Sequence, residues 1–146
     1  MGSDDGRRQA GGFANVVRLL VGLGFLAAAV GNSLFLLPDA EEQLESMLEL
    51  TLFDWYRDAF DAVVMPAPSL WVGLLAVYEL ATGLLILSRR RAVDVGLGMA
   101  VAFMLGIVPL IGWYSLTNLL TALVPAGLLF RRYERSLIDS LFRRPR

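Results

Sequence analysis

Four stretches of the chain consist almost entirely of apolar residues, and charged or polar segments separate them. These stretches lack the strict alternation of a half-buried strand, and their lengths are typical of helices that cross a membrane. The pattern predicts an all-α fold, an integral membrane four-helix bundle. The predicted spans cover residues 16–37, 70–87, 93–111 and 115–130. With about 22 residues, the first span is long enough to be a retained anchor rather than a cleaved signal peptide.

Residues 39–65, between the first and second spans, have an amphipathic pattern instead. Glu41, Glu45 and Glu49 recur at intervals of four, which places their carboxylates on one face of a helix. The opposite face is apolar and aromatic, and it carries Leu44, Met47, Leu48, Leu52, Trp55 and Tyr56. Such a segment is expected to lie on the outer membrane surface, with its aromatic rings at the level of the lipid headgroups.

The ends of this amphipathic helix have their own signals. Asp39 followed by Glu42 has the spacing of a capping box, which predicts that a single helix starts there and continues towards Val64. Pro66 and Pro68 then end it before the second span begins.

The remaining segments complete one domain with two appendages. Residues 1–14 have no apolar periodicity and are predicted to be a disordered cytoplasmic leader. Residues 15–131 form the four-helix membrane domain, in which Pro109 and Gly112 mark a tight outer turn before Trp113 and Tyr114. Residues 132–146 are predicted to be a basic amphipathic cytoplasmic tail that rests on the anionic inner leaflet.

Charge is distributed unevenly along the chain, and this predicts an orientation. Twelve of the 13 basic residues fall in three clusters beside the apolar stretches, whereas residues 39–65 carry eight acids and the single base Arg57. The clusters are Arg7, Arg8 and Arg18; Arg89, Arg90 and Arg91; and Arg131, Arg132, Arg135, Arg143, Arg144 and Arg146. Because cationic loops stay in the cytoplasm, we expect a multi-pass protein of the cell membrane with both termini inside.

Composition restricts the chemistry that this chain can perform. Hydrophobic residues make up 56% of the chain, which is more than an aqueous surface accommodates. Cysteine, histidine and lysine are all absent, which excludes disulfides, Cys/His metal sites, iron–sulfur ligation, His-ligated haem and Schiff-base catalysis. We therefore predict no metal site and no intrinsic cofactor, and a protein that is not an enzyme by itself. The arginine clusters are the usual flanks of membrane spans, so a nucleic-acid partner is not predicted.

Glu79 is the outstanding candidate for chemistry. It lies nine residues from Leu70 and eight from Leu87, which places it near the bilayer midplane. An ionised acid at the centre of a membrane helix costs about 2.5–3.5 kcal/mol, so the carboxyl must be protonated, paired or hydrated. One interpretation is a proton or ligand site. The other is a structural hydrogen bond to Asn32, Ser33, Tyr78, Thr82 or Asn118.

Two asparagines are predicted to lie near Glu79. By helix rise, Asn32 in the first span and Asn118 in the fourth lie at similar depths in the outer half of the membrane. They could bound a polar chamber with Glu79, open towards the acidic segment. The candidate ligand or proton site therefore comprises Glu79, Asn32, Asn118, Thr82 and Tyr78.

Arg18 and the small residues have structural interpretations. Arg18 either extends its guanidinium to the inner headgroups or reaches inward to Glu79. Small residues at helical spacing predict close helix packing. They are Gly24 and Ala28 in the first span, Gly83 in the second, and Gly98, Ala102 and Gly106 in the third.

The order of these features resembles the DoxX-like family of small four-helix membrane proteins. The resemblance covers about residues 17–130 and is strongest in the run from Tyr78 to Leu87, in which Gly83 follows Glu79 by four residues and after which three arginines come. Where that family often has Lys or His at the end of the first span, this chain has Asn32 and Ser33.

The resemblance implies a membrane subunit, linked in some family members to quinol oxidase or thiosulfate:quinone redox systems. The leading hypothesis is a non-catalytic subunit or accessory factor of a quinone-linked redox or respiratory complex, with a quinone as the bound group. Its expected partners are the lipid bilayer and other membrane redox subunits, and an oligomer is compatible with the sequence. The alternatives are a small transporter or channel that uses Glu79, and a membrane scaffold or assembly factor.

Overall fold

A computed structural model describes residues 8–9, 11–110 and 115–133 of the chain. Within these residues the fold is all-α, apart from two paired strands of two residues each. The elements are, in chain order, β1 (Arg8–Gln9), α1 (Gly12–Gly31), the π-helical turn η1 (Asn32–Leu36), α2 (Ala40–Leu48), α3 (Asp54–Val63), α4 (Pro68–Leu87), α5 (Arg91–Gly106), α6 (Ser115–Leu128) and β2 (Arg131–Arg132).

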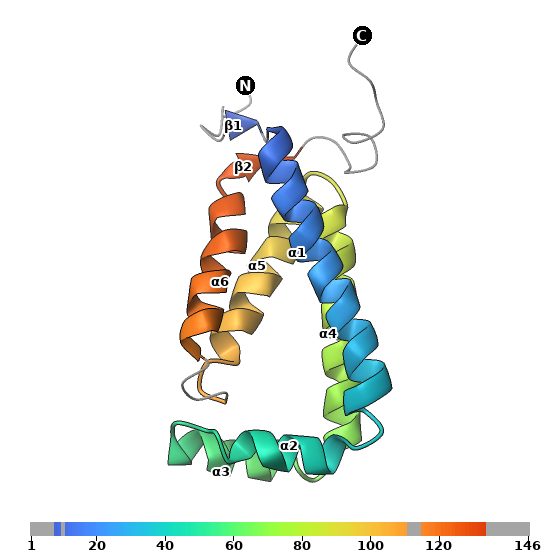
Figure 1. The fold of residues 1–146 in the computed structure, drawn as a ribbon, viewed down its shortest axis with the longest axis vertical. Coiled ribbons are helices and arrows are strands. Elements are labelled where there is room, and N and C mark those ends of the chain that lie inside the picture. The colour runs from blue at the N-terminus through green and yellow to red at the C-terminus, as the bar shows by residue number, and fades with distance from the viewer. Residues whose placement is uncertain (1–7, 10, 111–114, 134–146) are drawn as a thin grey trace.

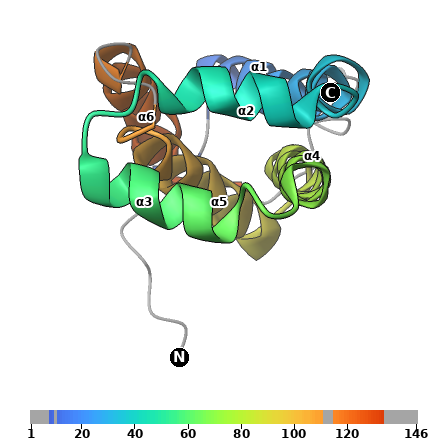
Figure 2. The same cartoon turned by 90° about the horizontal axis from the view of Figure 1, so that it is seen from below.

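Four helices, α1, α4, α5 and α6, form a bundle that is narrow at one end and wide at the other (Figure 1). At the narrow end lie β1, β2 and the connection between α4 and α5. At the wide end α2 and α3 run across the bundle, alongside each other (Figure 2). We call α2 and α3 the acidic cap, because they carry six of the eight acids of residues 39–61 and the other two flank α2. We call the opposite end the basic end.

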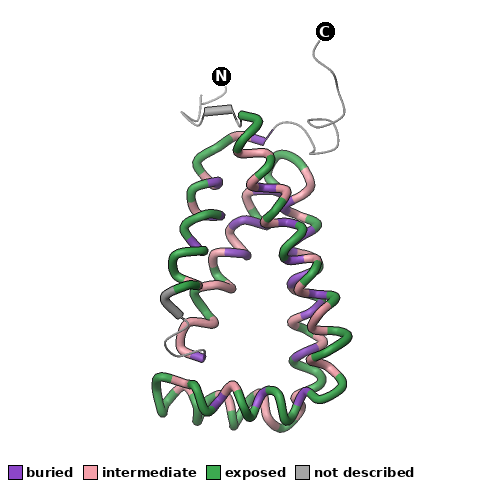
Figure 3. Tube along the Cα trace, in the orientation of Figure 1, coloured by how far each residue is buried: buried purple, intermediate pink, exposed green. Residues whose placement is uncertain are grey.

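Most buried hydrophobic side chains of the described residues fall into two clusters. Many residues on the outer faces of the bundle are exposed (Figure 3). The larger cluster lies towards the basic end and comprises Phe25, Ile86, Val93, Leu97, Ala100, Leu128 and Tyr133. The smaller cluster joins the acidic cap to the bundle and comprises Ala40, Leu44 and Val72. The core is therefore divided between the two ends.

Glycines allow the helices to approach closely at three positions, two of which were not predicted. A Cβ at Gly83 would lie 2.9 Å from the carbonyl oxygen of Gly22, and a Cβ at Gly96 would lie 2.7 Å from the backbone nitrogen of Ile86. A Cβ at Gly22 would lie 2.5 Å from a Leu87 side-chain atom. These contacts bring α1 against α4 and α4 against α5.

The predicted packing stripes on α1 and α5 were wrong, with Gly83 of α4 the exception among the predicted glycines. A Cβ at Gly24, Gly98 or Gly106 would meet nothing within 4 Å, and Ala102 is exposed while Ala28 is half-buried. Helical spacing identifies residues that share a face, but which face meets a neighbouring helix depends on how the helices cross.

Arg18 is buried at the basic end, and both sequence interpretations of it were wrong. Its Nε donates to the carbonyl oxygen of Ile86 at 2.8 Å, and its Nη2 donates to those of Leu87 at 3.3 Å and Ser88 at 2.6 Å. These carbonyls end α4 and have no partner within the helix. The side chain is 0% exposed, so Arg18 neither extends to a headgroup nor pairs with Glu79, and instead caps the C-terminus of α4.

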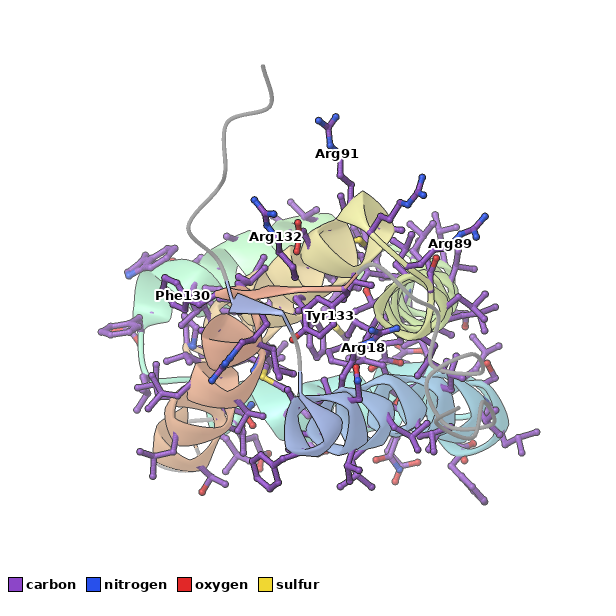
Figure 4. The ribbon with its side chains drawn as sticks, turned by 90° about the horizontal axis from the view of Figure 1, so that it is seen from above. Arg18, Arg89, Arg91, Phe130, Arg132 and Tyr133 are labelled. Atoms are coloured by element: carbon purple, nitrogen blue, oxygen red, sulfur yellow. The ribbon has the colours of Figure 1, made fainter. Side chains whose placement is uncertain are left out.

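Tyr133 completes this arrangement from the other side of the bundle. The Arg18 guanidinium lies 4.8 Å from the centre of the Tyr133 ring, and the two residues lie together at the centre of the basic end, whereas Arg89 and Arg91 point outward (Figure 4). The Tyr133 hydroxyl donates to the carbonyl oxygen of Leu128, and the backbone carbonyl of Tyr133 accepts from the amide of Arg90 at 2.6 Å. Burial raises the pKa of Tyr133 to about 12, so the ring stays neutral. Arg18 and Tyr133 thus join α1, α4, α5 and α6.

Several predicted boundaries differ from the structure. The expected leader contains the strand β1, which pairs in parallel with β2, and α1 begins at Gly12. The single amphipathic helix is two helices, because the amide of Leu52 bonds to the carbonyl of Pro109 at 3.1 Å instead of continuing the helical ladder. Asp39 stands at the N-cap of α2, but its side chain makes no capping hydrogen bond.

Two helices among the described residues are long and apolar enough to cross a membrane, Gly12–Leu36 and Pro68–Leu87. The other two are shorter than the predicted spans: α5 has 16 residues and α6 has 14. Residues 111–114 of the predicted turn, which begins at Pro109, and the tail beyond Tyr133 lie outside the described residues.

Candidate functional site

Glu79 and Asn32 form a hydrogen-bonded pair inside the bundle. Glu79 lies in the middle of α4 and is 3% exposed. The Asn32 amide nitrogen donates to Oε2 of Glu79 at 2.6 Å. Asn32 begins the π-helical turn, in which its carbonyl accepts from the amide of Leu37, five residues later, at 2.8 Å. Local π-helical turns are frequent at functional sites, because they shift the side chains of one turn relative to the rest of the helix.

Among the described residues no hydrogen bond involves the second carboxyl oxygen of Glu79, and Glu79 lines two cavities. We call the cavity beneath α2 and α3 the cap cavity; its volume is about 490 Å³. The other, the flank cavity, lies between α1 and α6 and has a volume of about 480 Å³. Ala28, Glu79 and Phe103 line both, so Glu79 stands at their junction.

Side chains of the acidic cap line one side of the cap cavity. Leu44 and Met47 of α2, and Tyr56 and Phe60 of α3, face the bundle here. Partial burial raises the pKa of the Tyr56 hydroxyl, which stays protonated and donates to the carbonyl of Gly106 at 3.3 Å. Part of the apolar face of this segment therefore lines a protein cavity. Its expected position on the outer membrane surface stays a prediction.

The flank cavity is bounded by α1 and α6. Its lining is apolar except for Glu79 and Thr121. The Thr121 hydroxyl lies 3.0 Å from the carbonyl oxygen of Thr117 and 3.1 Å from that of Asn118, so its proton is used by the backbone of α6. Thr121 can therefore only accept a hydrogen bond from a ligand, whereas Glu79 can accept one or, when protonated, donate one.

The structure brings Asn32 to Glu79 but not the other predicted residues. Asn118 lines neither cavity, because α6 and α4 lie on opposite sides of the bundle at its wide end (Figure 1). Tyr78 donates its hydroxyl to the carbonyl of Met99 at 2.8 Å and so joins α4 to α5. The Thr82 hydroxyl is buried without a partner among the described residues, and Thr82 lines neither cavity.

Phe103 was missed by the sequence interpretation. It lies edge-on to Phe25 with ring centres 6.0 Å apart, and its ring centre is also 6.0 Å from that of Tyr78. With Glu79 and Ala28, it lines both cavities. Phe103 is the one aromatic residue of α5, but a single aromatic residue in an apolar helix does not show which neighbours it meets.

The site suits an uncharged or weakly polar ligand. The described residues contain no group of three or more acids that could hold a metal ion. The carboxyl oxygen of Glu79 that has no bond to the described residues can accept a hydrogen bond from the ligand's head group or, when protonated, donate one to it. The aromatic and aliphatic walls of the cavities can hold the apolar part of the ligand.

The chain matches no protein-family model, no curated protein and no solved structure. The interpretation of the site therefore rests on its own geometry.

Proposed function

We propose that this chain is a multi-pass integral membrane protein in which α1, α4, α5 and α6 all cross the bilayer. Large apolar side chains are exposed along each of these helices, among them Leu20, Val77, Val95 and Leu123. Only 17% of the most apolar part of Gly12–Leu36 and 28% of that of Pro68–Leu87 is buried within the fold, whereas the core helix of a soluble protein is mostly buried. Lipid would cover the exposed apolar surface of these helices.

The charges support an orientation with the acidic cap outside the cell. The exposed acids of α2 and α3 lie at one end of the bundle, and Arg89, Arg90, Arg91 and Arg131 are exposed at the other. The rule that cationic loops remain in the cytoplasm then places both described chain ends, β1 and β2, inside.

Cysteine labelling tests this orientation, because the chain contains no cysteine of its own. We expect Asp58→Cys, on the acidic cap, to react with a membrane-impermeant maleimide in intact cells. Arg89→Cys, at the basic end, should react only after the membrane is permeabilised. Labelling of Arg89→Cys alone in intact cells would reverse the orientation, and equal labelling of both variants would contradict the spanning arrangement.

We further propose that the protein binds a quinone through Glu79, as a non-catalytic subunit or accessory factor of a quinone-linked redox complex. The observation that carries this proposal is Glu79, which lines two largely apolar cavities and has one carboxyl oxygen bonded to Asn32 and the other without a hydrogen bond to the described residues. The resemblance to the DoxX-like family, which rests on the run from Tyr78 to Leu87, agrees with it. Without a redox centre of its own, such a protein would hold or pass on the quinone rather than oxidise it.

Glu79→Gln tests the head-group contact. The variant keeps an oxygen that accepts from Asn32, but it replaces the second oxygen with an amide. In mild detergent we expect the affinity for a quinone that carries a decyl chain to fall about tenfold, which corresponds to the loss of one hydrogen bond to the head group. Tryptophan quenching measures the binding.

The control for this experiment is Glu45→Gln, a change on the exposed surface of the acidic cap. It should bind the quinone as the original protein does. Unchanged affinity in Glu79→Gln would remove Glu79 from the site, and loss of the folded state in that variant would show that the carboxyl serves helix packing.

A transporter that uses Glu79 is the second candidate, favoured because the same carboxyl lines both cavities. It would be supported by Glu79-dependent solute or proton uptake into proteoliposomes without quinone binding.

A further inference from the structure

The flank cavity lies on the side of the bundle where two helices leave a gap between them. Val17, Leu20, Val21 and Gly24 line it from α1, and Thr121, Val124 and Pro125 line it from α6. Leu20 is 64% exposed and Val124 is 42% exposed, so the rim of the cavity reaches the outer surface of the bundle. In the proposed membrane arrangement this rim faces lipid hydrocarbon rather than water.

A small residue keeps the α1 side of the rim open. Gly24 is exposed and lines the flank cavity, and a Cβ placed there would meet nothing within 4 Å. The position therefore has room for a side chain. This distinguishes Gly24 from Gly22 and Gly83, where a Cβ would meet the neighbouring helix.

The polarity of the lining changes along the route from the junction to the rim. Glu79 stands at the inner end, beside Ala28 and Phe103. Outward from it the lining side chains are apolar, and the one hydroxyl, of Thr121, is already hydrogen-bonded to its own helix. A hydrogen-bonding head group is thus favoured at the junction and an apolar chain along the flank.

We propose that the ligand is a quinone with a long apolar chain, which binds with its head group at Glu79 and its chain in the flank cavity, leaving the bundle between α1 and α6 into the bilayer. This inference rests on the proposed function, because it takes the membrane arrangement and the head-group contact from it. It adds that the chain is recognised and that the ligand enters from the lipid. A cavity of about 480 Å³ is of the size that holds small-molecule ligands.

Gly24→Phe tests the route of the chain, with Gly127→Phe as its matched control. Gly127 lies on α6, is exposed, would also meet nothing within 4 Å of an added Cβ, and lines neither cavity. The two probes are a dimethoxy-methyl-benzoquinone without a side chain and the same quinone with a decyl chain. We expect Gly24→Phe to weaken binding of the decyl quinone by about tenfold or more, because the ring fills the space of the chain. The chainless quinone should bind as before, and Gly127→Phe should change neither.

The variants separate failure of this inference from failure of the proposed function. Glu79→Gln should weaken the binding of both quinones. If it weakens the binding of neither, the proposed head-group contact is wrong. If Glu79→Gln weakens both probes but Gly24→Phe changes neither, the head-group site stands and the flank route is overturned. If Gly24→Phe weakens both probes equally, the head group lies in the flank cavity and the proposed arrangement is again overturned.

A second variant on the opposite rim guards against a folding defect in the first. Val124→Trp fills the same opening from α6, where Val124 is partly exposed. This variant should also weaken the binding of the decyl quinone and leave the binding of the chainless quinone unchanged. Unchanged binding of both probes to this variant, with the fold retained, would overturn the route.

Discussion

Replacing Arg18 with methionine is expected to lower the free energy of unfolding by about 3 kcal/mol or more, since hydrogen bonds to charged groups contribute about 1.5–3 kcal/mol each. The change removes three donated bonds, to Ile86, Leu87 and Ser88, from the C-terminus of α4. It also removes the cation beside the Tyr133 ring. Methionine keeps the length and apolar packing of the side chain, so the loss reports the polar contacts. Titration with a denaturing detergent, followed by the fluorescence of the three tryptophans, measures it.

Two further variants make this result specific. Arg89→Met removes a charge from an exposed residue of the same end and should change stability by no more than about 0.5 kcal/mol. Arg18→Lys keeps the charge but loses the planar arrangement of donors, so an intermediate loss is expected. Equal losses in Arg18→Met and Arg89→Met would show that net charge, rather than capping of α4, is responsible.

The pair Gly96→Ala and Gly98→Ala should change stability in opposite directions. A Cβ at Gly96 would lie 2.7 Å from the backbone nitrogen of Ile86 and 2.8 Å from the Cβ of Leu85, so α4 and α5 would have to move apart. Overpacking of this kind costs about 1–3 kcal/mol. At Gly98, two residues later on α5, a Cβ meets nothing within 4 Å. There alanine should stabilise the helix by about 0.5–1 kcal/mol.

The same unfolding titration measures both glycine variants. Because they make an identical chemical change in one helix, differences in helix propensity cancel and the comparison isolates the contact with α4. Destabilisation by both variants to the same extent would mean that α5 does not pack against α4 through Gly96.

The candidate site was partly predictable. Counting residues along helices predicts that Glu79 and Asn32 lie near each other along the bundle axis, and the structure joins these two side chains by a hydrogen bond. The same counting placed Asn118 at a similar depth, but it lines neither cavity. Helix rise gives position along the bundle axis only, whereas contact also depends on rotation about the helix axis and on the distance between helices.

Arg18 illustrates a second limit. Its place near the start of a long apolar helix is that of many arginines that extend to lipid headgroups. The structure instead buries it against the end of α4, about 70 residues later in the chain, through bonds at sequence separations of 68, 69 and 70. No local pattern reports a partner so distant, and the unpaired carbonyls that attract it occur at the end of every helix.

The amino-acid sequence by itself determined the helical class, the apolar character of the long helices, the segregation of acids from arginines, and the absence of thiol and imidazole chemistry. These properties depend on composition and on spacing within one element. The tertiary structure alone decided that the bundle widens towards the acidic cap, that the cap is two helices, and that Glu79 stands between two cavities. Those features arise from contacts between distant elements, where close approach at Gly83 and Gly96 and the capping of α4 by Arg18 set how the helices cross.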